Sequence, residues 1–204
     1  MPSLNRKYLI IRNLGLTFGF IILTSFTVKP EPKLQLLTRK SSENNNLKIT
    51  FPFLQKDFIG FKEALAFKES QGRYAIVNKF GYLGKYQFGK NTLRRLKVYN
   101  TSKFLKNPEL QEKAFVALCN INKWILRKDI HRFAGKRVNG IKITESGILA
   151  AAHLAGAGNV KKYLRSFGKF EFKDGFGTSI NSYMKKFGGY DVSNLKANKL
   201  ATVS

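Results

Sequence analysis

Apolar side chains recur at helical spacing along the chain, and the pattern is clear over residues 55–70. Phe58, Phe61 and Leu65 fall near one face of a helix drawn through this range. Gly72 follows directly, and glycine is favoured just beyond helix ends. The pattern therefore predicts an amphipathic helix that stops near Gly72.

Capping residues predict where later helices begin. Asn107-Pro108-Glu109 joins a capping amide, a proline suited to the first helical position and an acid in the first turn. Thr144 is the expected cap of a helix rich in small residues, which Gly156 and Gly158 should break. Shorter helices are predicted from Gly89 or Asn91 to Leu96, over 159–167, and over 179–187 with Thr178 as cap.

The helix after Pro108 should bury one apolar stripe. Its members are Leu110, Ala114, Ala117, Leu118, Ile121 and Ile125. Asn139-Gly140 predicts a tight hairpin between two helices. We therefore expect a mainly α domain over residues 49–192, with a small loop and hairpin region.

The first 28 residues read as an export signal. Arg6, Lys7 and Arg12 precede an apolar run over 14–28, and no acidic residue occurs before position 31. A retained signal-anchor over 8–28 or a buried core helix are the alternatives. The signal or anchor predicts an exported protein of the periplasm or cell envelope, held in the inner membrane if the segment is retained.

The flanking segments are polar. Residues 29–48 contain two prolines and a run of asparagines, so we expect a linker. Residues 193–204 are expected to form a polar, frayed tail.

Composition adds a strong charge imbalance. The chain has 37 Lys and Arg against 12 Asp and Glu, a net charge of +25, which favours a polyanionic partner. No zinc-finger, basic-zipper or RNP signature accompanies it, so nucleic acid is not the expected partner. The single cysteine, Cys119, is expected in the core, and two histidines and one cysteine at unrelated spacings predict no metal site and no cofactor.

The stretch from Glu69 to Gln87 carries the candidate chemistry. One carboxylate closes an apolar helix, and a polar segment rich in Gly, Asn and Tyr follows. A glycan-cleaving site can be built in this way, and an ordinary helix end with a turn is the alternative. Glu63 lies six residues before Glu69, about 120° away around a helix, so it is expected in solvent and not as a catalytic partner.

Four segments in order resemble the lysozyme-like lytic transglycosylases of the goose-lysozyme and soluble-transglycosylase type. They are Glu69-Ser70 after an apolar helix, Gly84-Lys85-Tyr86-Gln87-Phe88, ILAAAHLAGAGNV at 148–160, and Tyr183 on the last helix. Together they span about 115 residues. The forms GYLGKYQFG and DGFGTS are similar to a branch found in phage-tail and cell-wall lysins. His153 and Leu154 stand where the family has Tyr-Asn, which puts an amide contact in doubt.

The resemblance implies a lysozyme-like helical fold and cleavage of the MurNAc–GlcNAc bond of peptidoglycan, without cofactor. Glu69 would act as acid and then as base, giving 1,6-anhydro ends. Ser70 and Gln87 would hold the glycan, and Tyr183 would hydrogen-bond Glu69 or an intermediate.

Other residues have open roles. Tyr82 and Tyr86 are candidates for sugar contact, with loop packing as the alternative, and His153 either contacts sugar or is a core histidine bonded to backbone. Asp174 is the candidate second carboxylate of a hydrolase, or it orders its glycine-rich turn.

Three other functions remain open at this stage: a lysozyme-type hydrolase on the same fold, a wall-binding protein without activity, and a nucleic-acid binder favoured by charge alone.

Overall fold

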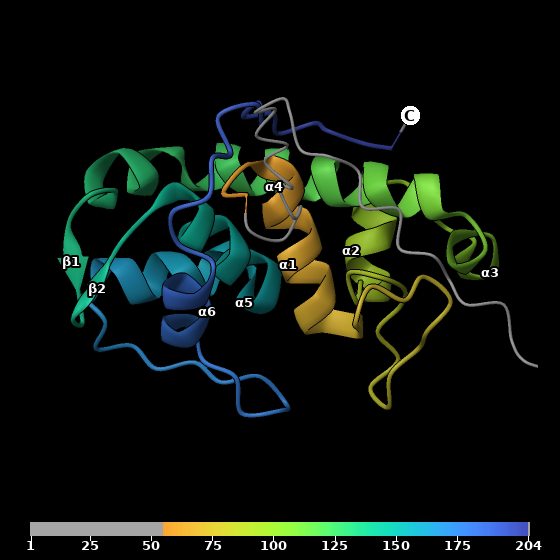
Figure 1. Ribbon diagram of the computed structural model, residues 1–204, viewed down its shortest axis with the longest axis horizontal. Coiled ribbons are helices and arrows are strands. Elements are labelled where there is room, and N and C mark those ends of the chain that lie inside the picture. The colour runs from red at the N-terminus through yellow and green to blue at the C-terminus, as the bar shows by residue number, and fades with distance from the viewer. Residues whose placement is uncertain (1–54, 204) are drawn as a thin grey trace, which may run out of the picture. The chain divides into compact units, whose positions relative to one another are not determined.

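The computed structural model describes residues 55–203, and these residues are mainly helical, as predicted (Figure 1). The predicted signal or anchor over 1–28 and the linker over 29–48 lie outside the described residues. The elements are α1 (Phe58–Ser70), α2 (Lys90–Arg95), α3 (Thr101–Leu105), α4 (Pro108–Phe133), β1 (Arg137–Val138), β2 (Ile141–Lys142), α5 (Glu145–Arg165) and α6 (Ile180–Lys186). Across residues 55–203, no helix is both long and apolar enough to cross a bilayer.

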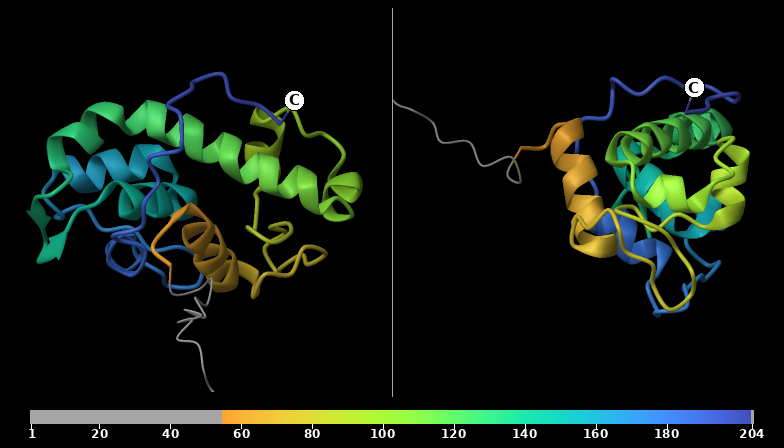
Figure 2. Two further views of the ribbon diagram at one scale, coloured as in Figure 1. Left: turned by 45° about the horizontal axis from the view of Figure 1, so that its top comes forward. Right: turned by 90° about the vertical axis from the view of Figure 1, so that its right-hand side faces the viewer.

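The long helix α4 organises the other helices. It runs across the top of Figure 1, with α5 packed against it and α6 packed against α5. Phe61 of α1 meets Phe115 of α4 with ring centroids 6.1 Å apart, and both side chains are fully buried. Figure 2 shows that α1 lies below α4 and runs at a steep angle to it, so that the carboxyl end of α1 points away from α4.

The predicted helix starts are confirmed where a local hydrogen bond decides them. Asn107 caps α4 through a bond from the Leu110 amide, and Thr144 caps α5 through one from Gly147. Gly156 interrupts α5 with φ 78° and ψ 149°, as expected, whereas the chain at Gly158 stays helical. The cap of α6 was predicted one residue early, because the hydroxyl of Ser179, not Thr178, accepts the Ser182 amide.

The predicted hairpin is also confirmed. Arg137 pairs with Lys142 and Val138 with Ile141 in an antiparallel register. Asn139 and Gly140 have φ of 48° and 76°, the positive values that a two-residue hairpin turn requires. The helix α3 was not predicted, and Asn100 caps it by accepting the Lys103 amide.

The buried face of α4 is rotated from the predicted stripe. Leu118 and Ile125 are only partly buried, whereas Gln111, Asn122 and Asp129 lie inside. Partners explain part of this difference: the Gln111 amide bonds three backbone segments, and Asp129 accepts the guanidinium of Arg165. A hydrophobic count alone misses polar side chains that are buried with partners.

The carboxyl-terminal segment is not frayed, which corrects the sequence-based expectation. The Lys196 and Asn198 amides donate to Asn120 of α4 at 3.0 and 3.1 Å. Leu195 is buried, and Val203 packs against the core. Two hydrogen bonds to Asn120 and the apolar contacts of Leu195 and Val203 thus hold this segment along α4.

Candidate active site

Two loops flank the carboxyl end of α1 and enclose the candidate site. They are residues 71–89 and 166–179, which project from the same side of the molecule in Figures 1 and 2. Two adjoining cavities of about 300 and 360 Å³ lie between them. Both cavities are lined by Glu69, Asn78, Gln87, Asp174 and Phe176. Glu69 therefore stands where the cavities meet, as a residue at the centre of a groove would.

The carboxylate of Glu69 has one polar partner among the described residues. The Tyr183 hydroxyl of α6 donates to Glu69 Oε1 at 2.6 Å, although 114 residues separate them. Burial and the neighbouring carboxylate raise the pKa of Tyr183, so this phenol stays protonated and remains a donor. No Lys or Arg of residues 55–203 forms an ion pair with Glu69.

Gln87 lines both cavities from the 71–89 loop. Its backbone has φ 50°, and its side-chain amide donates to the Gly84 carbonyl at 2.8 Å. This bond uses one donor of the amide and fixes its direction, while the side chain lines both cavities. The structure thus brings together Glu69, Gln87 and Tyr183 from three distant parts of the chain.

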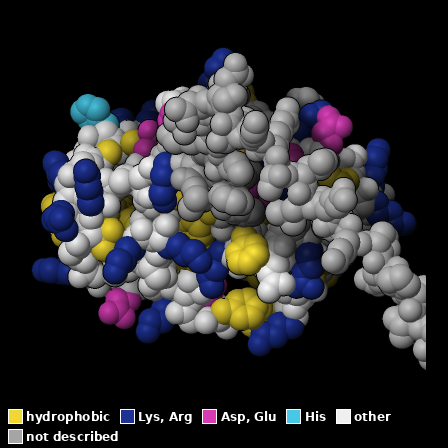
Figure 3. Space-filling view, viewed as in Figure 1, with side chains coloured by type: hydrophobic (Ala, Val, Ile, Leu, Met, Phe, Trp, Pro, Cys, Tyr) yellow, Lys and Arg dark blue, Asp and Glu magenta, His cyan; other side chains and the backbone are white. Residues whose placement is uncertain are grey.

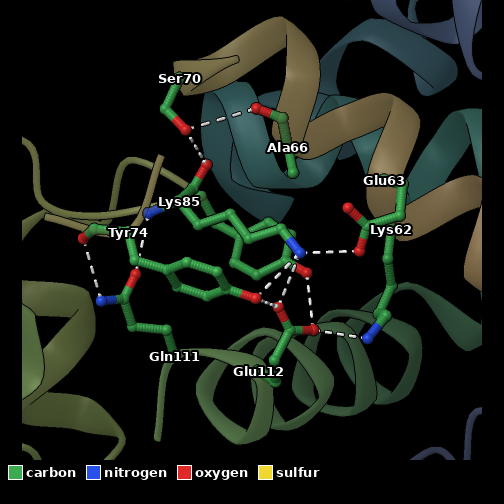
Figure 4. A network of polar contacts seen from close by, with 9 residues as sticks. Lys62, Glu63, Ala66, Ser70, Tyr74, Lys85, Gln111 and Glu112 are labelled. Carbon is green, nitrogen blue, oxygen red and sulfur yellow. Dashed lines mark hydrogen bonds and ion pairs between the residues drawn. The ribbon is translucent and has the colours of Figure 1, made fainter. Parts of the chain in front are cut away.

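The side chain of Ser70 is used within the protein. It is 5% exposed, and its hydroxyl donates to the Lys85 carbonyl at 2.7 Å, which ties the 71–89 loop to the end of α1 (Figure 4). Ser70 also borders the larger cavity. Its contact with substrate stays a prediction.

The two candidate tyrosines of the loop differ in exposure. Tyr82 is 45% exposed and lines the smaller cavity. Tyr86 is fully buried, stacked on Phe115 with centroids 4.1 Å apart, and its hydroxyl donates to Glu112. For Tyr86 the alternative prediction, loop packing, is therefore correct. The buried Tyr86 ring cannot stack on a sugar in this position.

His153 is bonded to backbone and also borders the site. Its Nε2 lies 2.8 Å from the Tyr86 carbonyl, so this nitrogen carries the proton. Nδ1 is buried and has no partner among the described residues. The ring lies edge-on to Phe88 and lines the smaller cavity beside Leu154. Contact of His153 with sugar stays a prediction.

Asp174 orders its glycine-rich turn, as one of the two predictions had it. Its Oδ1 accepts the amides of Phe176 and Thr178 at 2.9 and 2.7 Å. The 71–89 loop contains the same arrangement, because Asn78 Oδ1 accepts the amides of Phe80 and Tyr82 at 2.8 and 3.1 Å. Each turn thus places a phenylalanine two residues after the side chain that orders it.

These two phenylalanines meet across the site, and neither was among the predicted site residues. Phe80 and Phe176 touch edge to face with centroids 4.8 Å apart, and both line the smaller cavity. The parallel between NKFGY at 78–82 and DGFGT at 174–178 was the available signal.

A second cluster of charges lies on another face of α1. Lys85 Nζ donates to Glu63 and Glu112 at 2.7 and 2.8 Å, and the hydroxyls of Tyr74 and Tyr86 donate to Glu112 (Figure 4). We call these five residues, with Lys62 on Glu112, the Lys85 network. Glu63 is therefore paired and not free in solvent as predicted. The pairing of Lys85 with Glu112 was not predicted either, because the two residues are 27 positions apart in the sequence.

The pKa values in this network follow from its pairs. Burial alone would lower the pKa of Lys85, but hydrogen bonds to Glu112 and Glu63 raise it. Burial would raise the pKa of Glu112, but the bonds from Lys62, Lys85 and the two tyrosines lower it to about 2. Lys85 and Glu112 are thus both stabilised in their charged forms.

Within residues 55–203, no group of three or more His, Cys, Asp or Glu side chains is placed to hold a metal ion. Comparisons with protein-family models, with curated proteins and with solved structures find no match to this chain.

Proposed function

We propose that this protein is a peptidoglycan-cleaving lytic transglycosylase with a lysozyme-like fold, in which Glu69 is the catalytic acid and base. The observation that carries the proposal is the setting of Glu69. It is a carboxyl group without a cationic partner among the described residues, held by a neutral phenol, where two cavities meet. The order of Glu69, Gln87 and Tyr183 in the sequence and their convergence in space support the same assignment.

The proposed reaction needs one carboxyl group. Protonated Glu69 gives its proton to the bridging oxygen between MurNAc and GlcNAc, and the bond from this oxygen to the anomeric carbon breaks. The resulting carboxylate takes the proton of the muramic 6-hydroxyl, whose oxygen bonds to the anomeric carbon. The product is a 1,6-anhydro sugar, Glu69 is again protonated, and no water is consumed.

The Tyr183 hydroxyl suits both stages of this cycle. It donates to Oε1 and leaves Oε2, which accepts no hydrogen bond from the described residues, to exchange the proton with substrate. A donor on Oε1 also stabilises the carboxylate that forms when the proton leaves.

Hydrolysis on the same site is the second candidate, because Asp174 lines both cavities with Glu69. A hydrolase uses a second carboxylate to activate water or attack the sugar. Two backbone amides already occupy Asp174 Oδ1, which favours its role in the turn.

Mass spectrometry of fragments released from purified sacculi tests the proposal. Anhydro-ended fragments, one water lighter than reducing ones, are expected from the wild type, and Glu69→Gln should release none. Glu109→Gln is the matched control, since Glu109 is exposed at the start of α4, and it should release fragments as the wild type does. Reducing ends would support the hydrolase, and binding to sacculi without release would support an inactive wall-binding protein.

We also propose export to the periplasm or cell envelope, where peptidoglycan strands would be the partner. The basic and apolar pattern of residues 1–28 supports this proposal.

A further inference from the structure

The Phe80–Phe176 contact is built by two matching turns. In each turn, the first residue's amide donates to the carbonyl four residues on at 3.0 Å, and a glycine three residues on has a φ of 78° or 79°. The first side chain caps the amides two and four residues on, as described for Asn78 and Asp174. The glycine amide also donates to the carbonyl of the first residue, at 2.9 Å in one turn and 3.0 Å in the other. Four hydrogen bonds in each five-residue turn thus fix the backbone that carries the phenylalanine.

The rings are exposed although they touch. Phe80 is 51% and Phe176 59% exposed, so both rings forgo part of the free energy that burial of apolar surface gives. Apolar side chains that are exposed together often mark a binding site. Gly175 makes room for the contact, because a Cβ there would lie 3.2 Å from the Phe80 ring. Lys79 Nζ lies 5.1 and 5.3 Å from the two ring centres and adds a cation–π contact to each. The two loops are thus joined at their phenylalanines.

The cavities on the two sides of Glu69 differ. The cavity that contains both phenylalanines is about 300 Å³, the small end of the range for ligand pockets. The other, about 360 Å³, is lined by Phe176 but not Phe80, and Lys68 and Arg73 are part of its wall. Lys and Arg side chains are spread over the face seen in Figure 3. Of the two cavities, only the one of about 360 Å³ has Lys or Arg in its wall.

From this geometry we propose that the Phe80–Phe176 bridge closes the groove on one side of Glu69 and makes the enzyme cut glycan strands near an end. The inference rests on the proposed function. A strand crossing the whole groove would have to pass between two loops that are in contact. A strand end enters the 300 Å³ cavity without parting them, so the bond presented to Glu69 lies a short distance from that end.

The test follows the lengths of soluble, peptide-free glycan strands during digestion. The wild type should release short anhydro fragments from the outset while the long strands shorten gradually. Phe80→Ala combined with Phe176→Ala should open the groove, so that fragments of intermediate length appear early and their share rises about tenfold. Phe67→Ala is the matched control: this ring is also exposed, at 61%, but lines neither cavity, and the pattern should not change.

A conservative pair guards against a folding defect. Phe80→Tyr with Phe176→Tyr keeps both rings and should keep the wild-type fragment pattern. Early intermediate fragments from the wild type, or an unchanged pattern in a folded double alanine variant, would overturn the inference while the proposed function stands. No cleavage of any strand by the wild type would overturn both.

Discussion

Two carboxylates of α1, six residues apart, are placed in opposite circumstances. Glu63 receives a hydrogen bond from buried Lys85, whose other bonds lead to Glu112 and Tyr74. Glu69 receives one bond from a neutral hydroxyl and faces two cavities. The same side chain on the same helix thus belongs once to a closed ionic cluster and once to an open site.

The difference separates a carboxylate that supports the fold from one that is placed for chemistry. The Glu63 carboxylate is engaged in an ion pair with a buried cation that other groups also bind. A carboxylate with a neutral donor and an accessible oxygen can exchange a proton. Charge alone would draw attention to the Lys85 network, whereas Glu69 stands out because no Lys or Arg of residues 55–203 forms an ion pair with it.

Exchanging each carboxylate for its amide gives the largest expected contrast. Glu69→Gln should lower cleavage of sacculi by about 10³-fold or more, because it removes the proposed proton donor. Its free energy of unfolding should change by less than about 1 kcal/mol. Glu63→Gln, the matched change six residues earlier, should keep cleavage and lose stability. Urea unfolding and turbidity of sacculi measure both effects, and loss of cleavage in both variants would remove the contrast.

Removing the central cation of the Lys85 network should cost the most stability. Lys85→Ala leaves Glu63 and Glu112 close together without their shared partner, and breaking a buried pair costs about 3–5 kcal/mol. The side chains of Glu63 and Glu112 are 31% and 24% exposed, and solvent weakens their interaction with Lys85. We therefore expect the free energy of unfolding, measured in urea, to fall by about 2–3 kcal/mol.

The control for this prediction is Lys90→Ala. Lys90 is exposed at the start of α2, and its loss should cost less than about 0.5 kcal/mol. Equal stability of the two variants would mean that the Lys85 network does not support the fold.

Removing the phenol beside Glu69 should have an intermediate effect on activity. Tyr183→Phe keeps the buried ring and deletes the hydrogen bond to Glu69. A hydrogen bond to a charged group is worth about 1.5–3 kcal/mol, and the carboxylate that forms in the proposed reaction is such a group, so the rate should fall by about 10- to 100-fold. Steady-state rates on sacculi measure the effect. Tyr163→Phe is a suitable comparison, since its hydroxyl bonds Asn181 away from Glu69, and a similar fall there would contradict a specific role for Tyr183.

The smallest expected effect is the acid dependence of stability. Folding lowers the pKa of Glu112 from 4.5 to about 2, so the folded protein binds fewer protons than the unfolded chain between these values. The stabilisation is complete above about pH 4.5 and is lost as the pH falls toward 2. Urea unfolding from pH 6 to 2 should show this loss, and Glu112→Gln should show a shallower one. If the free energy of unfolding falls as steeply with pH in Glu112→Gln as in the wild type, Glu112 is not the source of this pH dependence.

Local signals made much of the fold predictable from the sequence. Asn107 and Thr144 cap their helices with bonds to residues three positions away, and Asn139-Gly140 closes a two-residue turn. Such contacts depend on a few neighbouring residues, so the sequence displays them. The one-residue error at Ser179 arose because Thr178 beside it carries the same capping group.

Contacts between distant segments were not predictable. Nothing near Lys85 in the sequence indicates Glu112, because the two residues meet only after the helices have packed. The matching segments around Phe80 and Phe176 indicate two similar turns, but not that the two rings touch. The burial of Tyr86 has the same origin, since its stacking partner Phe115 lies on α4. Glu69 and Tyr183 were paired in advance only through the resemblance.

Because the chain has a single cysteine, and that cysteine is buried, spin labels can be attached selectively to cysteines introduced into the two loops. Cys119 is 3% exposed on α4, and burial raises the pKa of its thiol, so it resists alkylating reagents at neutral pH. One cysteine introduced into each loop would therefore carry a spin label without replacing the natural one. Pulsed dipolar measurements could then follow the distance between the loops in solution, with and without sugar.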